Sequence, residues 1–402
     1  MSGEIKAAGS SVGELLDRLI APCVRWSSHR WWPVIAVAVA LGLVWATGFP
    51  NYIPKGPPEF LRALEWWLQH PFQAIPVADI FGTVEPDDGY ASHCDKRVYR
   101  GLLPLLHTVL PFGLPMVRVV GYLAGVAVFA ICYLLVSRGR KDPLAAALFI
   151  WALALSYSGP WPFIDWHYFG DGLAVALLVA AMLARPVWLS ALLIVLAGFT
   201  DERAIVASPL VGLFKAWQEL PPFAQASPSV FAAPLRYLSA GQTALWGIIG
   251  YAAIRLILST TGTGPSGSSQ LASLPILLEH YYESFPARVF SVFEFLWCVP
   301  VLFVWSGLAY LGRTNTKWLL FGLFMCMAAV PAVLVRDIDR SLYYLLPGLV
   351  GALVFLPQGS ASVRRMLAVC LIGGLIYTPL NQFVFNKAVI NAVGGAGTKI
   401  NR

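Results

Sequence analysis

Charged side chains are scarce in this sequence. Only 12% of the 402 residues are charged, whereas 58% are hydrophobic and the mean hydropathy is +0.68. A water-soluble domain carries about 25% charged residues, so an ordinary soluble protein is excluded. The apolar runs are long and continuous, without the alternation of barrel strands. The sequence therefore predicts an all-α polytopic membrane protein, with membrane lipids as its surroundings.

Motifs of several site classes are also missing. The six cysteines show no CxxC metal spacing and no disulfide framework. No glycine-rich loop opens a helix, so nothing indicates a nucleotide site. The net charge of +7 comes from scattered basic residues, and no basic run or stacking motif forms a nucleic-acid face. We therefore expect no nucleic-acid partner.

Apolar segments predict about 11 transmembrane helices in a single integral membrane domain, residues 1–402. A membrane-spanning helix needs about 20 apolar residues. The first part of the second segment is expected to lie in the interface, and 187–217 is either two full spans or a shallow hairpin. A Ser/Gly-rich stretch predicts a flexible outer loop at 260–286. The segments are 32–49, 102–136, 143–158, 167–184, 187–200, 204–217, 242–259, 287–310, 318–335, 341–357 and 366–384.

Basic residues in short loops predict the orientation. With eleven spans, these residues all fall on the side of the N-terminus, which places the N-terminus in the cytoplasm and the C-terminus outside it. We expect the inner (plasma) membrane of a bacterium. Acidic residues do little to set topology, yet most of them fall on the outer side, which indicates that the chemistry or binding is there. The basic loop residues are Arg138, Arg140, Lys141, Arg313, Lys317, Arg364 and Arg365.

An acidic loop at residues 50–101 follows the first predicted span. Residues 59–68 have a helical apolar period, which predicts a helix on the membrane surface. Asp79, Asp87 and Asp88 follow it, and a carboxylate beside the bilayer can act as general base on a sugar hydroxyl or hold a divalent cation. Asp79 is the favoured base because apolar residues flank it. The alternative for Asp87 and Asp88 is a solvated turn.

Three arginines stand where outer loops enter predicted spans: Arg100, Arg336 and Arg340. Guanidinium groups bind phosphate oxygens through paired hydrogen bonds, so these residues are candidates for holding the phosphate of a lipid-linked donor. The alternative is anchoring to lipid head groups by snorkelling.

Ionisable and polar residues also cluster at the mouths of other predicted spans. Such groups are costly at membrane depth unless they are paired or line a wet cavity, so we expect them to line one outer cavity. The alternatives are a structural His–Asp pair and an exposed charged turn. The candidates are Asp165, His167, Asp171, Asp201, Glu202, Arg203 and Tyr344.

Five stretches, in this order along the chain, resemble the GT-C superfamily of polytopic glycosyltransferases that use polyprenyl-phosphate sugars. The resemblance implies an inverting transfer on the outer face, from a polyprenyl-phosphate-linked sugar to a hydroxyl of a glycan, lipid or protein acceptor. No cofactor is implied beyond a possible role for a divalent cation. The stretches are the loop from Asp79 to Asp88, Tyr99–Leu105, Asp171–Ala174, Asp201–Ile205 with Pro209-Leu210 after it, and Asp339–Pro347.

Two other functions are compatible with the sequence. A secondary transporter would use Asp171, Asp201, Glu202 and Glu294 as an ion or proton relay near the bilayer midplane. A membrane protein that handles lipids or glycans without catalysis would not need the loop carboxylates. A transferase differs from a transporter in placing its polar residues near the outer surface.

Overall fold

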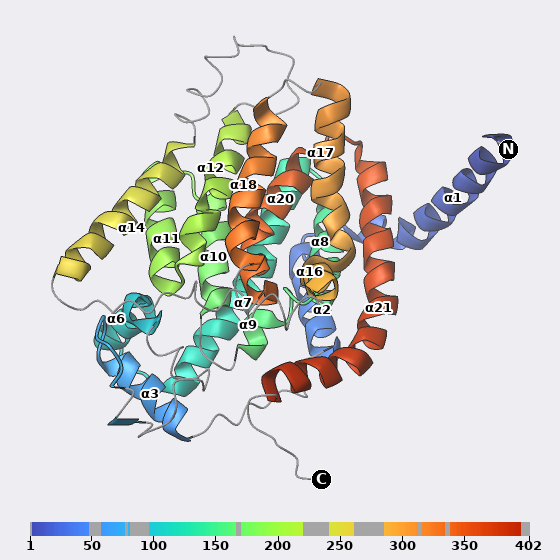
Figure 1. The fold of residues 1–402 in the computed structure, drawn as a ribbon. Coiled ribbons are helices and arrows are strands. Elements are labelled where there is room, and N and C mark those ends of the chain that lie inside the picture. The colour runs from blue at the N-terminus through green and yellow to red at the C-terminus, as the bar shows by residue number, and fades with distance from the viewer. Residues whose placement is uncertain are drawn as a thin grey trace.

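Helices make up all the regular structure in the described parts of the chain, which confirms the predicted all-α class. The structure is a computed structural model, shown in Figure 1. It describes residues 2–47, 58–76, 79–80, 96–165, 170–219, 241–260, 285–311, 316–333 and 338–394.

Short 3-10 helices, labelled η, stand between several of the α-helices. In chain order the helices are α1 (Ser2–Trp26), α2 (Trp32–Thr47), α3 (Pro58–Gln69), η2 (Lys96–Tyr99), α6 (Leu102–Val109), α7 (Leu114–Arg140), α8 (Pro143–Leu155), α9 (Trp161–Ile164), α10 (Asp171–Leu183), α11 (Val187–Thr200), α12 (Arg203–Glu219), α14 (Gln242–Thr260), α16 (Phe285–Phe293), η4 (Glu294–Trp297), α17 (Cys298–Leu311), α18 (Thr316–Val333), α19 (Ile338–Leu342), η5 (Tyr343–Leu345), α20 (Leu346–Phe355) and α21 (Ser360–Gly394).

Each predicted span coincides with one or more helices, but their lengths differ. Five stretches are long and apolar enough to cross a membrane: Leu114–Arg140, Gln242–Thr260, Phe285–Ala309, Ile338–Phe355 and Ser360–Thr378. Five shorter apolar helices have 10–17 residues: Trp32–Thr47, Pro143–Leu155, Asp171–Leu183, Val187–Thr200 and Leu319–Ala332. These helices indicate a membrane protein, and the count of about eleven crossings stays a prediction.

Two predicted spans are interrupted. The segment 102–136 divides into α6 and α7, because Pro111 lies between them and Pro115 starts the second helix. The segment 287–310 bends at Glu294, whose backbone is left-handed with φ +48°. The apolar pattern does not encode such a residue, so the sequence predicted one continuous span there.

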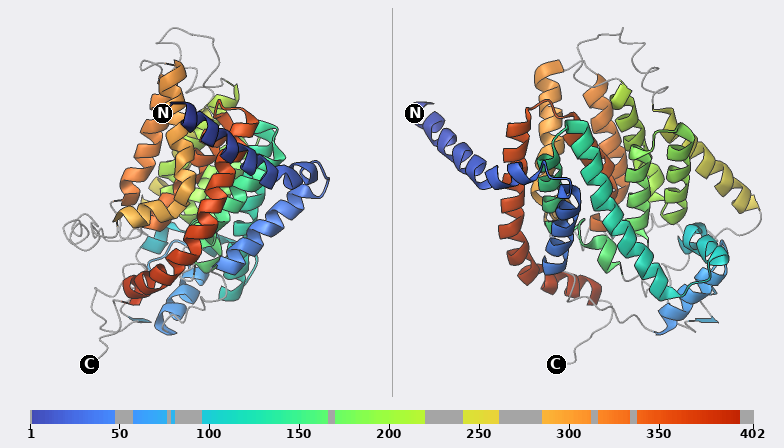
Figure 2. Two further views of the ribbon diagram at one scale, coloured as in Figure 1. Left: turned by 90° about the vertical axis from the view of Figure 1, so that its right-hand side faces the viewer. Right: turned by 180° about the vertical axis from the view of Figure 1, so that it is seen from behind.

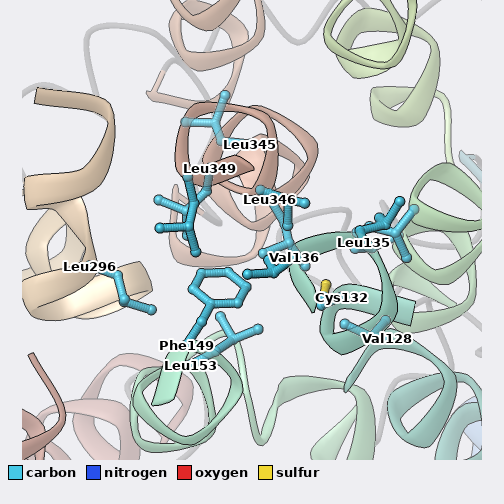
Figure 3. Packing of buried hydrophobic residues seen from close by; sticks show 14 of the residues in the cluster. Val128, Cys132, Leu135, Val136, Phe149, Leu153, Leu296, Leu345, Leu346 and Leu349 are labelled. Carbon is cyan, nitrogen blue, oxygen red and sulfur yellow. The ribbon is translucent and has the colours of Figure 1, made fainter. Parts of the chain in front are cut away.

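The centre of the bundle is α8. Asp142 begins it by accepting a hydrogen bond from the backbone N–H of Ala145 at 3.1 Å, and Pro143 suits the first helical position. Every residue from Leu144 to Leu155 is buried. In Figure 3 Phe149 and Leu153 of this helix meet side chains from α7, η4 and α20. A helix that is apolar all round is thus enclosed by others.

Polar contacts gather at the two ends of the bundle. At one end Arg140 donates to the carbonyls of Leu353 and Leu356 at 2.9 Å, and Arg364 pairs with Asp142 at 2.8 Å. At the other end lie α3, α6 and α9 (Figure 1), and Trp161 of α9 donates a hydrogen bond to Asp171, the first residue of α10, at 3.2 Å. Near the first end, α1 extends away from the bundle (Figure 2), and Asp17 pairs with Arg365 at 2.5 Å.

Candidate functional site

Two aspartates mark the ends of neighbouring helices. Asp171 is the first residue of α10 and follows Gly170, whose φ of +80° favours glycine. Asp201 follows the last residue of α11, two positions before α12 begins at Arg203. Both carboxylates are fully buried. Buried charges are tolerated only when they are paired and hydrogen-bonded, so their partners decide what this region can do.

Asp201 binds two arginines. Its Oδ1 accepts from the backbone N–H of Arg203 at 3.0 Å and from Nε of Arg203 at 2.8 Å. Its Oδ2 lies 2.7 Å from Nη2 of Arg203 and 2.8 Å from Nη2 of Arg100. The turn between α11 and α12 thereby folds Arg203 back onto the carboxylate in a fork-like contact.

Asp171 is bound on both oxygens as well. Its Oδ1 accepts from Nη2 of Arg203 at 2.8 Å and from the hydroxyl of Tyr344 at 2.9 Å. Its Oδ2 accepts from the indole N–H of Trp161 at 3.2 Å and lies 2.7 Å from Nε of Arg340. Arg203 thus bridges the two aspartates, and Asp171 ties α9, α10, α12, α19 and η5 together.

We call six residues the charged cluster: Arg100, Asp171, Asp201, Glu202, Arg203 and Arg340. Three arginines face three carboxylates, so the formal charge of the cluster is zero. Burial alone would raise the pKa of Asp201, but the guanidinium charges of Arg100 and Arg203 lower it well below its usual range. Burial would lower the pKa of Arg100, but Asp201 and Glu202 reverse this and raise it.

Glu202 lies at the rim of the charged cluster. Its side chain is 42% exposed, and its Oε2 is 3.5 Å from Nε of the buried Arg100. A second arginine stands near this rim: the guanidinium of Arg255 lies 4.1 Å from the ring centroid of Tyr99 and donates to the hydroxyl of Tyr251 at 2.9 Å. Glu202 is therefore the carboxylate of the cluster that a ligand can reach from outside.

A small cavity adjoins the charged cluster. It has a volume of ≈ 50 Å³ and lies between α7, α9 and α10. Arg118, Tyr122 and Asp165 line it together with apolar side chains, and Asp165 also accepts a hydrogen bond from the backbone N–H of Gly170 at 2.8 Å. The cavity thus stands one residue away from Asp171 along the chain.

An open apolar groove of ≈ 670 Å³ runs between α11 and α14. Its lining includes Trp188, Leu192, Val195 and Trp246, and the two tryptophans are largely exposed. Arg255 lies nine positions after Trp246 on the same helix, which corresponds to about 14 Å along its axis. The groove and the rim of the charged cluster therefore lie toward opposite ends of the helix pair α11 and α14.

The structure brings seven of the predicted site residues into contact through direct bonds: Arg100, Asp171, Asp201, Glu202, Arg203, Arg340 and Tyr344. Asp165 lines the adjoining cavity. The geometry differs from the expected open cavity, because Asp171, Asp201 and Arg340 are buried and bonded to one another. Asp87, Asp88, His167 and Arg336 lie outside the described residues.

Asp79 lies apart from these contacts. Its side chain is exposed, while the neighbouring Ile80 packs against the apolar cluster that contains Trp67 and Leu68 of α3. Of these two neighbouring residues, the apolar one is thus packed against the protein and the carboxylate lies at the surface. This differs from the expectation that Asp79 is partly desolvated.

Several residues of this region were not expected from the sequence. Trp161 and Ser341 bind Asp171 and Arg203, and Arg288 pairs with Asp339 at 2.7 Å beside them. Arg255 carried a usable signal, because it is a single charge in an otherwise apolar segment. The indole and hydroxyl partners carried none, since Trp and Ser are common in such segments.

The described residues hold no group of three or more His, Cys, Asp or Glu side chains arranged to bind a metal ion. Cation binding was one alternative for the carboxylates of the acidic loop, and two of these, Asp87 and Asp88, lie outside these residues. Comparison with protein families, with characterised proteins and with solved structures gives no match. What the protein does is therefore inferred from its own residues.

Proposed function

We propose that this protein is a membrane glycosyltransferase that works at the end of the bundle carrying the charged cluster. It moves a sugar from a polyprenyl-phosphate donor to a hydroxyl of a glycan, lipid or protein acceptor, on the extracytoplasmic side. The observation that carries the proposal is the position of the cluster at helix ends, with Glu202 at its rim, 3.5 Å from the buried Arg100. A transporter relay would instead place such charges in the middle of spans.

Contacts between the motifs support the same function. Four of the five stretches that resemble the GT-C superfamily contribute a residue to the charged cluster: Arg100, Asp171, Asp201 and Arg340. These residues are far apart in the sequence and lie in or directly beside different helices. Their contact is what a shared site requires, whereas unrelated surface charges would stay apart.

The apolar groove supports a lipid-linked donor. A prenyl chain lying between α11 and α14 would bury its apolar surface against Trp188, Leu192 and Trp246. Its phosphate would then lie near Arg255 at the rim, with the buried Arg100 behind Glu202, and guanidinium groups can bind phosphate oxygens. Such charges would also stabilise the phosphate as it leaves.

The proposed reaction is an inverting displacement. The acceptor hydroxyl attacks the anomeric carbon of the sugar, the bond from that carbon to the phosphate oxygen breaks, and the polyprenyl phosphate leaves with the bonding electrons. A carboxylate takes the hydroxyl proton. Glu202 is the base that the geometry favours, since Asp171 and Asp201 have both oxygens bound by arginines. Asp79 is the competing base from the acidic loop.

Secondary transport is the second candidate, and Glu294 is the observation that favours it. This carboxylate is buried within the stretch Phe285–Ala309, where its Oε1 lies 3.5 Å from the hydroxyl of Thr378. A buried acid in a span is a common feature of ion and proton pathways. A Glu294→Gln variant that still binds the lipid donor but has lost sugar transfer would not separate the two functions. The flux of substrate across the membrane must therefore be measured directly in that variant.

The test compares three variants of the purified protein on a panel of undecaprenyl-phosphate sugars. We expect Glu202→Gln to lower the release of undecaprenyl phosphate about 10²–10⁴-fold, the usual contribution of a positioned base. Glu219→Gln, an exposed glutamate at the far end of α12, is the matched control and should act like the wild type. If Asp79→Asn instead abolishes release while Glu202→Gln does not, Asp79 is the base. Full turnover by both would remove the transferase proposal for these carboxylates.

A further inference from the structure

Two cysteines from distant parts of the chain bring their sulfur atoms together. Cys298, the first residue of α17, is partly buried, and Cys370 on α21 is buried. Their Sγ atoms are 3.5 Å apart, although 72 positions separate them in the sequence. Neither residue belongs to the charged cluster, the small cavity or the groove, so the pair is independent of the proposed transferase activity.

The sequence explains why these helices approach so closely. Glu294 turns the chain with its left-handed backbone, and η4 then lies against α21. Gly373 makes room for this, because a Cβ atom on it would lie 2.8 Å from the ring of Phe295. The Sγ of Cys370 is also 3.4 Å from the carbonyl oxygen of Phe295, which directs the thiol toward the start of α17. Helix packing thus fixes the positions of both thiols.

We propose that Cys298 and Cys370 form a covalent modification site, a dithiol that small apolar disulfides oxidise to an intramolecular disulfide. A disulfide requires an S–S distance of about 2.05 Å, so the two sulfurs must approach by rotation of their side chains from the observed 3.5 Å. The partly buried Cys298 is the first to react, since reaction with a disulfide depends on access.

The chemistry is two successive thiol–disulfide exchanges. One cysteine, as the thiolate, attacks a sulfur of the reagent, which forms a mixed disulfide and releases one reagent thiol. The second cysteine attacks the protein sulfur of the mixed disulfide and releases the other reagent thiol. The protein loses two thiol protons and two electrons, and the reagent disulfide is reduced to two thiols. The product joins α17 to α21.

The experiment treats the purified full chain with a dipyridyl disulfide, whose released thiopyridone is measured by absorbance. A variant with Cys23, Cys94, Cys132 and Cys326 changed to serine keeps only the proposed pair. We expect two thiopyridones per chain, no retained pyridyl group by intact mass, and a peptide that links Cys298 to Cys370. The Cys370→Ser change in that background should release one thiopyridone and retain one pyridyl group, on the more accessible Cys298.

A matched control keeps Cys132 and Cys326 as the sole cysteines, one buried on α7 and one exposed on α18. It should retain every pyridyl group that it gains, because these thiols have no partner thiol nearby in the described chain. Peptide mapping of the treated wild-type chain gives the same readout without substitutions, so a folding defect in the variants cannot account for the result. Retained pyridyl groups on both Cys298 and Cys370, or a native protein that reacts only after denaturation, would overturn the proposal.

Discussion

Asp201 holds two guanidinium groups in a place that excludes water, and Arg203 extends the same contact to Asp171. Desolvating such groups is unfavourable, and their mutual attraction offsets this only while every member is present. Glu202, at the rim, is less constrained because 42% of its side chain is exposed. At the scale of single residues, the cluster thus has a buried, fully paired interior and one partly exposed carboxylate at its edge.

Removing one interior charge should therefore be costly. We expect Asp201→Asn to lower the free energy of unfolding by about 3–5 kcal/mol, because Arg100 and Arg203 would stay buried without their countercharge. Denaturant unfolding in detergent measures the change. Glu59→Gln is the control: it removes an exposed pair with Arg62, and its effect should stay below about 1 kcal/mol. Equal losses for the two variants would contradict the account.

Acid should remove the same stabilisation. The pKa of Asp201 is lowered in the folded protein by Arg100 and Arg203, against the effect of burial, while the unfolded value is about 3.9. Its contribution is therefore fully present above about pH 4 and is lost as the pH falls toward the folded pKa. The stability difference between wild type and Asp201→Asn should shrink with acid. A difference that grows below pH 4 would show the opposite sign of linkage.

Membership of the charged cluster was largely predictable, but its pairing was not. Ionisable residues beside apolar runs must find partners, and this singled out Asp171, Asp201, Arg203 and Arg340 from the sequence alone. Which arginine binds which aspartate depends on how helices separated by up to 170 positions come together. The exposure of Asp79 was missed for a related reason: apolar neighbours in sequence do not imply burial of the residue between them.

At the scale of helices, long apolar runs predicted the elements well because burial and membrane insertion both require them. The bend at Glu294 was not predicted, since a single left-handed residue leaves hydropathy nearly unchanged. The division of 102–136 was anticipated only as a first part expected to lie in the interface, without the break between α6 and α7. Close helix packing was also hidden from the sequence. It depends on glycines whose neighbours are known only from the fold.

Gly247 provides a test of that packing. A Cβ atom there would lie 2.6 Å from Cγ2 and 2.7 Å from Cβ of Ile194, where α14 meets α11. Gly247→Ala should therefore lower the free energy of unfolding by about 1–3 kcal/mol, the usual effect of overpacking. Gly42→Ala is the control, because nothing lies within 4 Å of its added atom, and helix propensity alone would stabilise it by up to about 1 kcal/mol. A tolerated Gly247→Ala would contradict the close contact.

At the scale of the whole molecule, ionisable contacts separate to opposite ends of the bundle. Arg140, Asp142 and Arg364 meet at one end, and the charged cluster occupies the other. The residues at the first end were assigned from the sequence to the cytoplasmic side, and those of the charged cluster to the outer side. The orientation itself stays a prediction.

Reporter fusions test that orientation. A reporter placed after Arg140 should be cytoplasmic, because this position belongs to the basic end. A second reporter near Gly264, which lies in the predicted outer loop and outside the described residues, should be extracytoplasmic. The reverse pattern would place the charged cluster in the cytoplasm and exclude transfer on the outer face.

The central claim, that the protein consumes a lipid-linked sugar, is tested most directly by mass spectrometry of cellular lipids. Extracts are compared from cells with the wild-type protein, cells without it, and cells that carry Glu202→Gln or the control Glu219→Gln at equal levels. A polyprenyl-phosphate sugar should accumulate in cells without the protein and in the Glu202→Gln cells, and it should return to normal with Glu219→Gln. Unchanged lipid-linked sugars in cells that lack the protein would contradict the account.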